Sequence, residues 1–310
     1  MSERPIILGT RGSALALAQA EMTEAVLREV FPEKEIIRKV IKTTGDKRTD
    51  VPLSQVAKVT GVLDKGVFTK ELEVALEAGE IDIAVHSMKD VPTVLAAHFA
   101  IAGVLERAPV SDVLISSHAG GLQGLPEGAT VATSSVRRQR QLLWLRPDLN
   151  LTDIRGNVPT RIGKLSSEEG LDAIMLAEAG LVRLGYDIAK PLDCGSIVSA
   201  LDTGEFLPAA GQGIVGFEIR SDDEDSRKIV EAITHKPSMV QSRAEREFLR
   251  LLDAGCHTPV GVRSEIAEEV LTMEALVFAD EGDGPPRKAK VSGEVANPEA
   301  AAKALFKALA

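Results

Sequence analysis

The chain has 310 residues, too many for one ordinary hydrophobic core, so its length predicts two or three domains. Its composition, 44% hydrophobic and 26% charged, is that of a soluble globular protein. A net charge of −10 and an aromatic content of 3% argue against nucleic acid as a partner, because such binding draws on excess basic residues and stacking side chains. The longest run without a charged residue, 91–105, is too short to cross a bilayer, so we expect no membrane association.

The N-terminal residues lack the basic segment and apolar core of a secretory signal, so we expect a cytoplasmic protein. Cys194 and Cys256 lie far apart with no Cys-x-x-Cys pattern, which predicts neither a disulfide framework nor a metal site. His86 and His257 also have no partner at metal-ligand spacing, and we expect structural roles for both.

Strand-like and helix-like segments alternate along the first hundred residues. Their apolar periodicity predicts strands at 6–8, 35–41 and 81–85, and helices at 15–30 and 68–76. Polar turns follow the strands, at 9–13, 43–46 and 86–92. Because strands and helices alternate, we expect a parallel sheet.

The same pattern recurs later in the chain. It predicts a strand at 130–132, a polar turn at 133–138, a helix around 142–145, and strands at 149–154 and 170–176. Segment 170–176 is similar to segment 79–85, and both enter a polar or glycine-containing loop. We therefore expect two similar α/β domains with a cleft between them.

The last part of the chain differs in kind. The acidic run 221–225 is interpreted as a solvated boundary. A helical stripe is expected to end at Gly255, and two strands, 271–279 and 287–295, precede a final helix capped by Asn297. These elements predict a small α+β domain.

Ligands of parallel sheets collect beyond the carboxyl ends of the strands, where the polar turns 10–13 and 133–138 are expected. N-capping accounts for the hydroxyl groups in these turns but not for the arginine in each. Segment 131–161 has six arginines and two acidic residues, a local positive charge that suits a ligand with several carboxylates or phosphates. Two of these arginines, Arg140 and Arg146, are expected on a helix surface, solvated or salt-bridged.

Two further positions have both a structural and a functional interpretation. Lys89 and Asp90 directly follow a predicted strand, where aspartate is also a common turn former. A small core residue is the commoner role of a free cysteine such as Cys256, although its loop position just past a helix end also permits a lasting thioether attachment. The residues alone leave both alternatives open.

A series of motifs, in order across about residues 6 to 261, resembles the porphobilinogen deaminase family. The matching segments are 9–19, 65–72, 84–92, 133–138, 155–161, 207–213 and 255–261. The resemblance implies two α/β domains like type II periplasmic binding proteins, joined by two crossing segments, and a small C-terminal α+β domain that carries the cofactor. The implied bounds are 1–104 with 213–231, then 105–212, then 232–310.

The resemblance also implies an activity, the head-to-tail joining of four porphobilinogen molecules into hydroxymethylbilane with loss of ammonia. Each porphobilinogen carries an acetate and a propionate, which is the kind of ligand that the arginines suit. Cys256 is implied to hold a dipyrromethane cofactor through a thioether. Asp90 is implied to hold pyrrole N–H groups, stabilise an azafulvenium cation and assist proton transfer.

The remaining site residues are likewise implied by the resemblance. Cofactor binding is expected of Lys89, Asp90, Ser135, Arg137 and Arg138. Substrate or chain binding is expected of Arg11, Ser13, Gln19, Lys65, Phe68, Arg155, Arg161, Arg183 and Gln212. No metal is expected, and the family suggests a monomer.

Two other classes of protein are weaker alternatives. A ligand-sensing or solute-binding module would share the two-domain cleft but would not need Cys256. A nucleotide-using enzyme would explain anion sites at helix N-termini, yet neither Gly-x-Gly-x-x-Gly nor Gly-x-x-x-x-Gly-Lys-Ser/Thr occurs in the sequence.

Overall fold

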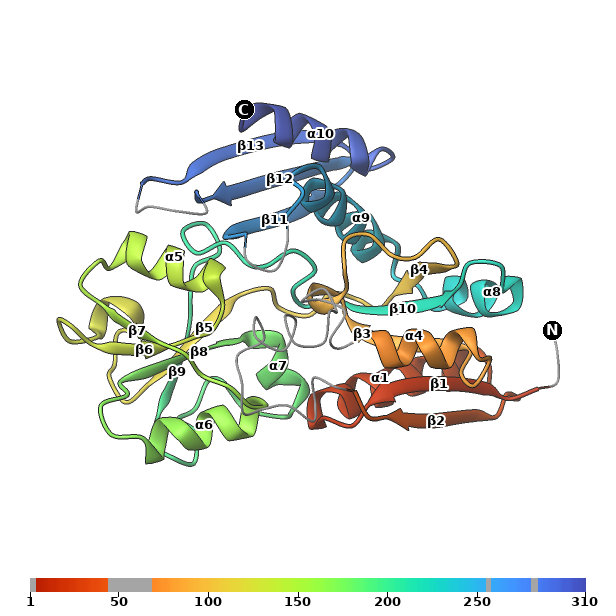
Figure 1. Ribbon diagram of the computed structural model, residues 1–310, viewed down its shortest axis with the longest axis horizontal. Helices are drawn as coiled ribbons and strands as arrows, with labels where there is room; N and C mark the ends of the chain where they lie inside the picture. The colour runs from red at the N-terminus through yellow and green to blue at the C-terminus, as the bar shows by residue number, and fades with distance from the viewer. Residues whose placement is uncertain (1–3, 44–68, 255–257, 280–283) are drawn as a thin grey trace. The chain divides into compact units, whose positions relative to one another are not determined.

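The computed structural model describes residues 4–43, 69–254, 258–279 and 284–310 (Figure 1). The chain divides into two compact units. The first consists of Met1–Ala108 and Ile214–Arg243, and the second of Pro109–Gly213 and Ala244–Ala310. The second unit thus includes most of the predicted C-terminal domain, from Ala244 onward, and the three-domain bounds stay a prediction.

The first unit is a five-stranded sheet with helices on both faces. Its elements are β1 (Ile6–Arg11), α1 (Ala14–Val30), β2 (Ile36–Ile41), α4 (Lys70–Glu77), β3 (Ile83–Ser87), the 3-10 turn η2 (Met88–Asp90), β4 (Phe99–Val104), β10 (Val215–Arg220) and α8 (Glu224–Ala232). The order is β2-β1-β3-β10-β4. Alternation along β3 sends Val85 into the core with Leu27 of α1, and Ala84 into the core with Leu72 of α4.

The second unit begins with a sheet of the same design. Its elements are β5 (Asp112–Ser116), η3 (Gly121–Gly124), β6 (Thr130–Ala132), α5 (Val136–Leu145), β7 (Asn150–Thr152), α6 (Val158–Ser167), β8 (Ala173–Ala177), α7 (Glu178–Arg183) and β9 (Ile197–Ala200). The order β7-β6-β8-β5-β9 repeats that of the first sheet, strand for strand. Met175 packs on the α5 side with Leu142, and Ile174 on the α6 side with Ile162.

The expectation of purely parallel sheets is wrong in one respect. In the first sheet β10 runs antiparallel to both its neighbours, and in the second β5 does the same. Each of these strands is the first strand after the chain enters the unit, so its direction is not set by a strand-helix-strand crossover. The shared order with one reversed strand is the type II periplasmic-binding-protein arrangement, which confirms the predicted fold class.

The C-terminal segment forms a small α+β layer, as predicted. Helix α9 (Lys236–Leu251) leads to the antiparallel strands β11 (Val260–Ala267), β12 (Val270–Val277) and β13 (Arg287–Glu294), and α10 (Pro298–Ala308) lies against β12 and β13 (Figure 1). Asn297 caps α10 by accepting a hydrogen bond from the Ala300 amide at 3.2 Å, as expected. Ala302 and Leu305 of α10 are fully buried.

Several predicted boundaries shift. β3 begins at Ile83 and extends through Ser87, beyond the expected 81–85. Helix α9 ends at Leu251 and Asp253 beyond it has a left-handed backbone, at φ 51°, whereas Gly255, the expected end, lies outside the described residues. The acidic run 221–225, interpreted as a solvated boundary, leads into α8, which Asp223 caps by accepting from the Ser226 amide at 2.9 Å, and the division between the units falls at 243/244.

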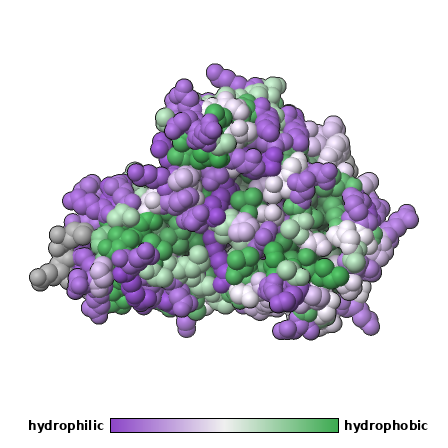
Figure 2. All heavy atoms as spheres, turned by 180° about the vertical axis from the view of Figure 1, so that it is seen from behind, coloured by the Kyte–Doolittle hydropathy of each residue, from purple (hydrophilic) through white to green (hydrophobic). Residues whose placement is uncertain are grey.

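Hydrophobic side chains reach the surface in patches among hydrophilic ones on the face that Figure 2 shows. Large apolar residues with exposed fractions of 45–70% include Val94, Trp144 and Val182. Such exposure is ordinary for a folded protein. Among the described residues, no helix combines the length and the apolar character that a membrane span requires.

Candidate functional site

In the first unit, a pocket opens at the carboxyl ends of the parallel strands β1 and β3. It has a volume of about 60 Å³ and is lined by Arg11, Ser13, Leu15, Ala16, Gln19, Thr69, Val85, His86, Ser87 and Asp90. Arg11 ends β1, and Asp90 ends the 3-10 turn that follows β3. The pocket therefore brings together four of the residues singled out in the sequence: Arg11, Ser13, Gln19 and Asp90.

Two polar pairs hold the end of β3. The Gln19 amide donates to Ser87 Oγ at 2.8 Å, and Ser87 Oγ donates back to Gln19 Oε1 at 3.1 Å. His86 Nε2 lies 2.9 Å from Glu218 Oε2 of β10, and both side chains are buried. Gln19 is thus engaged inside the protein, and His86 has the structural partner expected of it. Nothing in the sequence pattern pointed to Glu218.

The Glu73 carboxyl of α4 lies near the His86–Glu218 pair. Burial raises the pKa of the Glu73 carboxyl on α4, and the nearby Glu218 carboxylate raises it further. One oxygen of Glu218, Oε1, is buried and has no hydrogen-bond partner in the structure. Buried carboxylates without full compensation are rare and costly, which marks this end of β3 as specialised.

The hydroxyl-rich turns act as helix caps. Ser13 accepts from the Ala16 amide at 3.3 Å, Ser135 from the Arg138 amide at 3.5 Å, and Asn157 from the Thr160 amide at 2.9 Å. These bonds confirm the capping interpretation of the two turns. The arginines beside the caps need a separate explanation.

Arg137 and Arg138 converge on one buried carboxylate. Asp112, the first residue of β5, accepts from Arg137 Nη1 at 2.6 Å and from Arg138 Nη2 at 2.7 Å and Nε at 2.9 Å. Arg138 Nη1 donates to the Met175 carbonyl at 2.9 Å, so each of its side-chain nitrogens has a protein acceptor. The Gln212 amide also donates to Asp112, at 3.2 Å. Asp112 was missed from the sequence, where its signal was an acidic residue directly before the apolar run 113–115.

The charge on Asp112 is strongly favoured. Burial raises the pKa of its carboxyl, but the guanidinium groups of Arg137 and Arg138 outweigh burial and hold the pKa well below its ordinary range. Two cations surround one anion in a site where all three side chains are at most 7% exposed. This cluster therefore carries an excess of buried positive charge.

Arg183, at the end of α7, is a cation with less compensation. Its Nη2 donates to the Gly213 carbonyl at 2.6 Å, whereas its buried Nε has no partner among the residues that the structure describes. Burial lowers the pKa of Arg183 to about 10. No carboxylate pairs with it in the part of the chain that the structure describes. A guanidinium in this state is suited to a carboxylate that comes from a ligand.

The other predicted arginines have different settings. Arg155 and Arg161 are half-buried after β7, which runs parallel to β6, and Arg161 Nε donates to the Gly156 carbonyl at 2.7 Å. Gly156 has φ 114°, a conformation that favours glycine. Arg146 is salt-bridged to Asp148 at 2.7 Å, as expected, and also binds the carbonyls of 122, 125 and 126.

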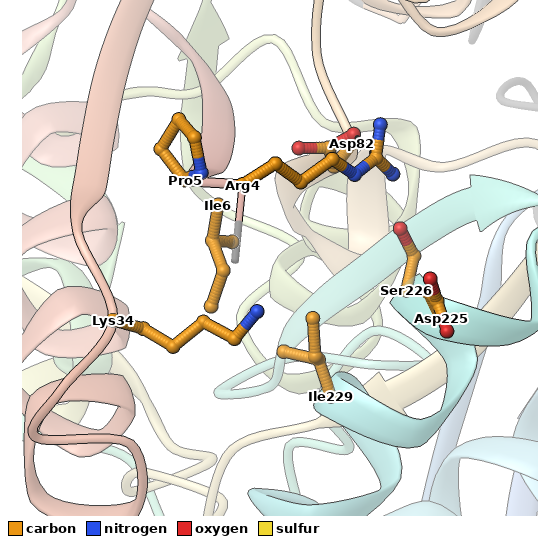
Figure 3. Close-up of a pocket in the computed structure, with 8 residues that line it drawn as sticks. All are labelled: Arg4, Pro5, Ile6, Lys34, Asp82, Asp225, Ser226 and Ile229. Atoms are coloured by element: carbon orange, nitrogen blue, oxygen red, sulfur yellow. Dashed lines mark ion pairs between the residues drawn. The ribbon is translucent and has the colours of Figure 1, made fainter. Parts of the chain in front are cut away.

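A second pocket lies at the amino ends of β1 and β3 (Figure 3). Arg4, Lys34, Asp82 and Asp225 contribute balanced charge, and the volume is about 10 Å³, room for about one water molecule. Asp82 is occupied structurally, because it accepts from the Ile7 amide at 2.9 Å. Ligands of α/β sheets bind at the opposite edge, so we do not assign a functional site here.

Four residues singled out in the sequence, Lys65, Phe68, Cys256 and His257, lie outside the described residues. Lys89 is half-buried on the same 3-10 turn as Asp90. Taken together, a type II α/β architecture with cationic side chains and one pocket carboxylate at strand ends defines a protein that acts on a small polyanionic ligand.

The comparisons with known proteins identify that class more closely. Residues 6–228 match the family model of the porphobilinogen deaminase dipyromethane cofactor binding domain, and residues 239–310 match that of the porphobilinogen deaminase C-terminal domain. The porphobilinogen deaminase of Chlorobaculum parvum is 44% identical over 299 residues, covering 96% of this chain and 91% of that protein. That of Syntrophomonas wolfei is 45% identical over 290 residues, covering 94% and 89%.

The chain belongs to the porphobilinogen deaminase family. It is a transferase of tetrapyrrole biosynthesis that condenses porphobilinogen, and its cofactor is a dipyrromethane. Among solved structures, the periplasmic aliphatic sulphonate binding protein SsuA from Escherichia coli is 14% identical, covers 79% of this chain and 72% of that chain, and gives a TM-score of 0.42. A likeness of that degree carries no argument about the ligand.

We predict that Asp112→Asn lowers the free energy of unfolding by about 3–5 kcal/mol at pH 7, because it leaves two buried guanidiniums without their anion. The depressed pKa means that Asp112 stabilises the fold fully above the unfolded value near pH 4, and that this stability is lost as pH falls through the folded value. Urea unfolding at pH 7 and at acidic pH measures both effects. A variant as stable as the parent at pH 7 would contradict the central role of this carboxylate.

For Arg183→Met we predict the opposite combination, loss of binding without loss of stability. Removing a poorly compensated buried cation leaves the unfolding free energy unchanged or raises it, whereas the KM for porphobilinogen rises about tenfold or more. The matched control is Lys190→Met, which removes an exposed cation with 78% side-chain exposure and leaves both quantities within error. Equal KM values for the two variants would contradict a ligand role for Arg183.

Proposed function

We propose that the enzyme joins four porphobilinogen molecules head to tail into hydroxymethylbilane, releasing ammonia, on a dipyrromethane that Cys256 holds through a thioether. The observation that supports this most strongly is the pocket at the ends of β1 and β3, where a single carboxylate, Asp90, lies with the cation Arg11 and the hydroxyl of Ser13. We further propose that the enzyme is a cytoplasmic monomer without a nucleic acid partner, in keeping with its net charge of −10.

A dipyrromethane made from two porphobilinogen units carries acetate and propionate groups, so its site must supply several cations. The buried and uncompensated Nε of Arg183 is evidence for an anionic ligand of this kind. Lys89 and Ser135 are the further residues that we assign to the cofactor, and Arg155 and Arg161 those that we assign to the substrate or the growing chain. The donor set therefore fits a polycarboxylate.

The two arginines of the Ser135 turn differ in what they can offer. Arg138 has protein acceptors on all of its side-chain nitrogens, whereas among the described residues the hydrogen bonds of Arg137 leave from Nη1 alone. We therefore assign direct cofactor binding to Arg137. Arg138 acts by holding the start of α5, where Ser135 caps the helix.

When bound, the dipyrromethane supplies the free pyrrole α-carbon to which the first porphobilinogen is joined. Arg11 binds a carboxylate of the incoming porphobilinogen and thereby orients its ring toward Asp90. The Asp90 carboxylate accepts hydrogen bonds from pyrrole N–H groups and stabilises the positive charge that develops on the substrate as ammonia leaves. It then assists removal of the α-proton after the carbon–carbon bond has formed. Gln19 supports the position of Asp90 through its hydrogen bonds to Ser87. We assign Gln212 a supporting role at the other cluster, where it donates to Asp112.

The cofactor attachment predicts a mass. Purified active protein should be heavier than its sequence by one dipyrromethane unit, and Cys256→Ala should remove that excess. Cys194→Ala is the matched control, because Cys194 is exposed and should leave the excess mass in place. Active protein with the mass of the bare chain would overturn the attachment.

The role of Asp90 predicts a ranking of two variants. Asp90→Asn should keep the fold and polypyrrole binding but lose roughly a hundredfold to a thousandfold in rate, by analogy with the loss of one oxyanion-hole donor. Asp90→Glu should lose less, because the charge survives. A turn-forming role predicts the opposite order, since asparagine suits turns and glutamate does not. Single-turnover rates of both variants, purified with cofactor confirmed by mass, decide between the two.

A further inference from the structure

The end of β3 is held by side chains on both faces of the sheet. Ser87 shares its face with Val85 and pairs with Gln19 of α1. His86 shares its face with Ala84 and pairs with Glu218 of β10 at 2.9 Å. The Asp90 turn begins at the next residue, so these two pairs lie directly before the turn that carries the carboxylate.

The neighbouring strand β10 makes a second contact with the same turn. His86 lies opposite Gly216 in the antiparallel register, two residues from Glu218 on the same face. A Cβ at Gly216 would overlap the sulfur of Met88, so the glycine lets Met88 lie directly against β10. The Met88 amide also donates to the Ile214 carbonyl at 3.0 Å. One face of β10 thus holds both His86 and the first residue of the Asp90 turn.

Burying the His86–Glu218 pair carries a desolvation cost that an apolar pair would not. His86 is 5% exposed and Glu218 is fully buried, and Glu218 Oε1 lacks a partner. The surrounding groups raise the cost, since the Glu73 carboxyl from α4 lies close enough for Glu218 to raise its pKa. Well-packed apolar residues in place of such a pair are often neutral or stabilising. The pair therefore calls for an explanation other than stability.

We propose that Glu218 and His86 are positioning residues for Asp90, and that their buried hydrogen bond fixes the end of β3 and hence the carboxylate on the turn that follows. This proposal rests on the proposed role of Asp90. It assigns no contact with substrate to either residue. Catalysis requires the Asp90 carboxylate to lie within a fraction of an ångström of its productive position. A strand end that is hydrogen-bonded on both faces of the sheet holds it there.

The test compares two replacements of Glu218. Glu218→Leu removes the acceptor but keeps an apolar side chain of similar size, whereas Glu218→Gln keeps an oxygen that can accept from His86. We expect kcat to fall about tenfold or more in Glu218→Leu, with the KM for porphobilinogen and the cofactor mass unchanged. We expect Glu218→Gln to keep kcat within about threefold of the parent. A purely structural role predicts that Glu218→Leu loses stability but keeps the parental kcat.

A double variant and a control complete the experiment. His86→Leu combined with Glu218→Leu should be no slower than Glu218→Leu alone, because both changes remove the same bond. The control is Glu274→Leu in the C-terminal sheet, where a buried glutamate pairs with Arg263 at 3.0 Å, and its loss should lower stability without lowering kcat. Parental kcat in Glu218→Leu, equal losses in the Leu and Gln variants, or additive losses in the double variant would each overturn the proposal.

Asp90→Asn measured in the same assay separates this proposal from the one on which it rests. Parental turnover in Asp90→Asn would mean that Asp90 has no catalytic role, and both proposals would then be wrong. A slow Asp90→Asn together with a fast Glu218→Leu leaves Asp90 in place and overturns the positioning role alone.

Discussion

The second unit is organised around the need to neutralise buried positive charge at the ends of its strands. Asp112 meets that need for two guanidiniums at once, and the same bonds join β5, α5 and, through the Met175 carbonyl, β8. A buried carboxylate with a depressed pKa is tolerated because both cations are held in place by helix α5, which Ser135 caps. Positive charge still exceeds negative charge there. A site for a polycarboxylate needs an excess of positive charge. The excess must stay small, because uncompensated buried charge destabilises the fold.

The two sheets solve a related problem with the same element. In each sheet one strand runs against its neighbours, and in each that strand carries a buried carboxylate, Glu218 in β10 and Asp112 in β5. A strand between two neighbours is shielded from water, so an acid on it must find a partner within the unit. Glu218 pairs with the imidazole of His86, and Asp112 pairs with two guanidinium groups. The acid therefore fixes a side chain next to the ligand-binding edge in both cases.

The sequence was informative where a signal is local. The strand, polar turn and helix around Ser13 and Ser135 were predicted because apolar periodicity and capping residues act within a few positions, and the motifs brought Asp90 into view as a candidate. The reversed strands and their acids were not predicted. Glu218 pairs with His86 across 132 positions, and Asp112 with Arg138 across 26, distances over which no spacing rule operates. The adjacency of β10 and β3 had to come from the fold.

The arginines show how far a charge count can be taken. Segment 131–161 suggested several ligand-binding cations, but Arg138 is consumed by Asp112 and a carbonyl, and Arg146 by Asp148 and three carbonyls. Arg183, outside that segment, is the cation whose burial without a described carboxylate argues most directly for a ligand. Local charge density alone thus does not separate arginines that are paired within the protein from those left for a ligand. An arginine suited to a ligand is one whose burial in the folded chain is not offset by a carboxylate of the protein. A ligand carboxylate offsets that desolvation cost when it binds.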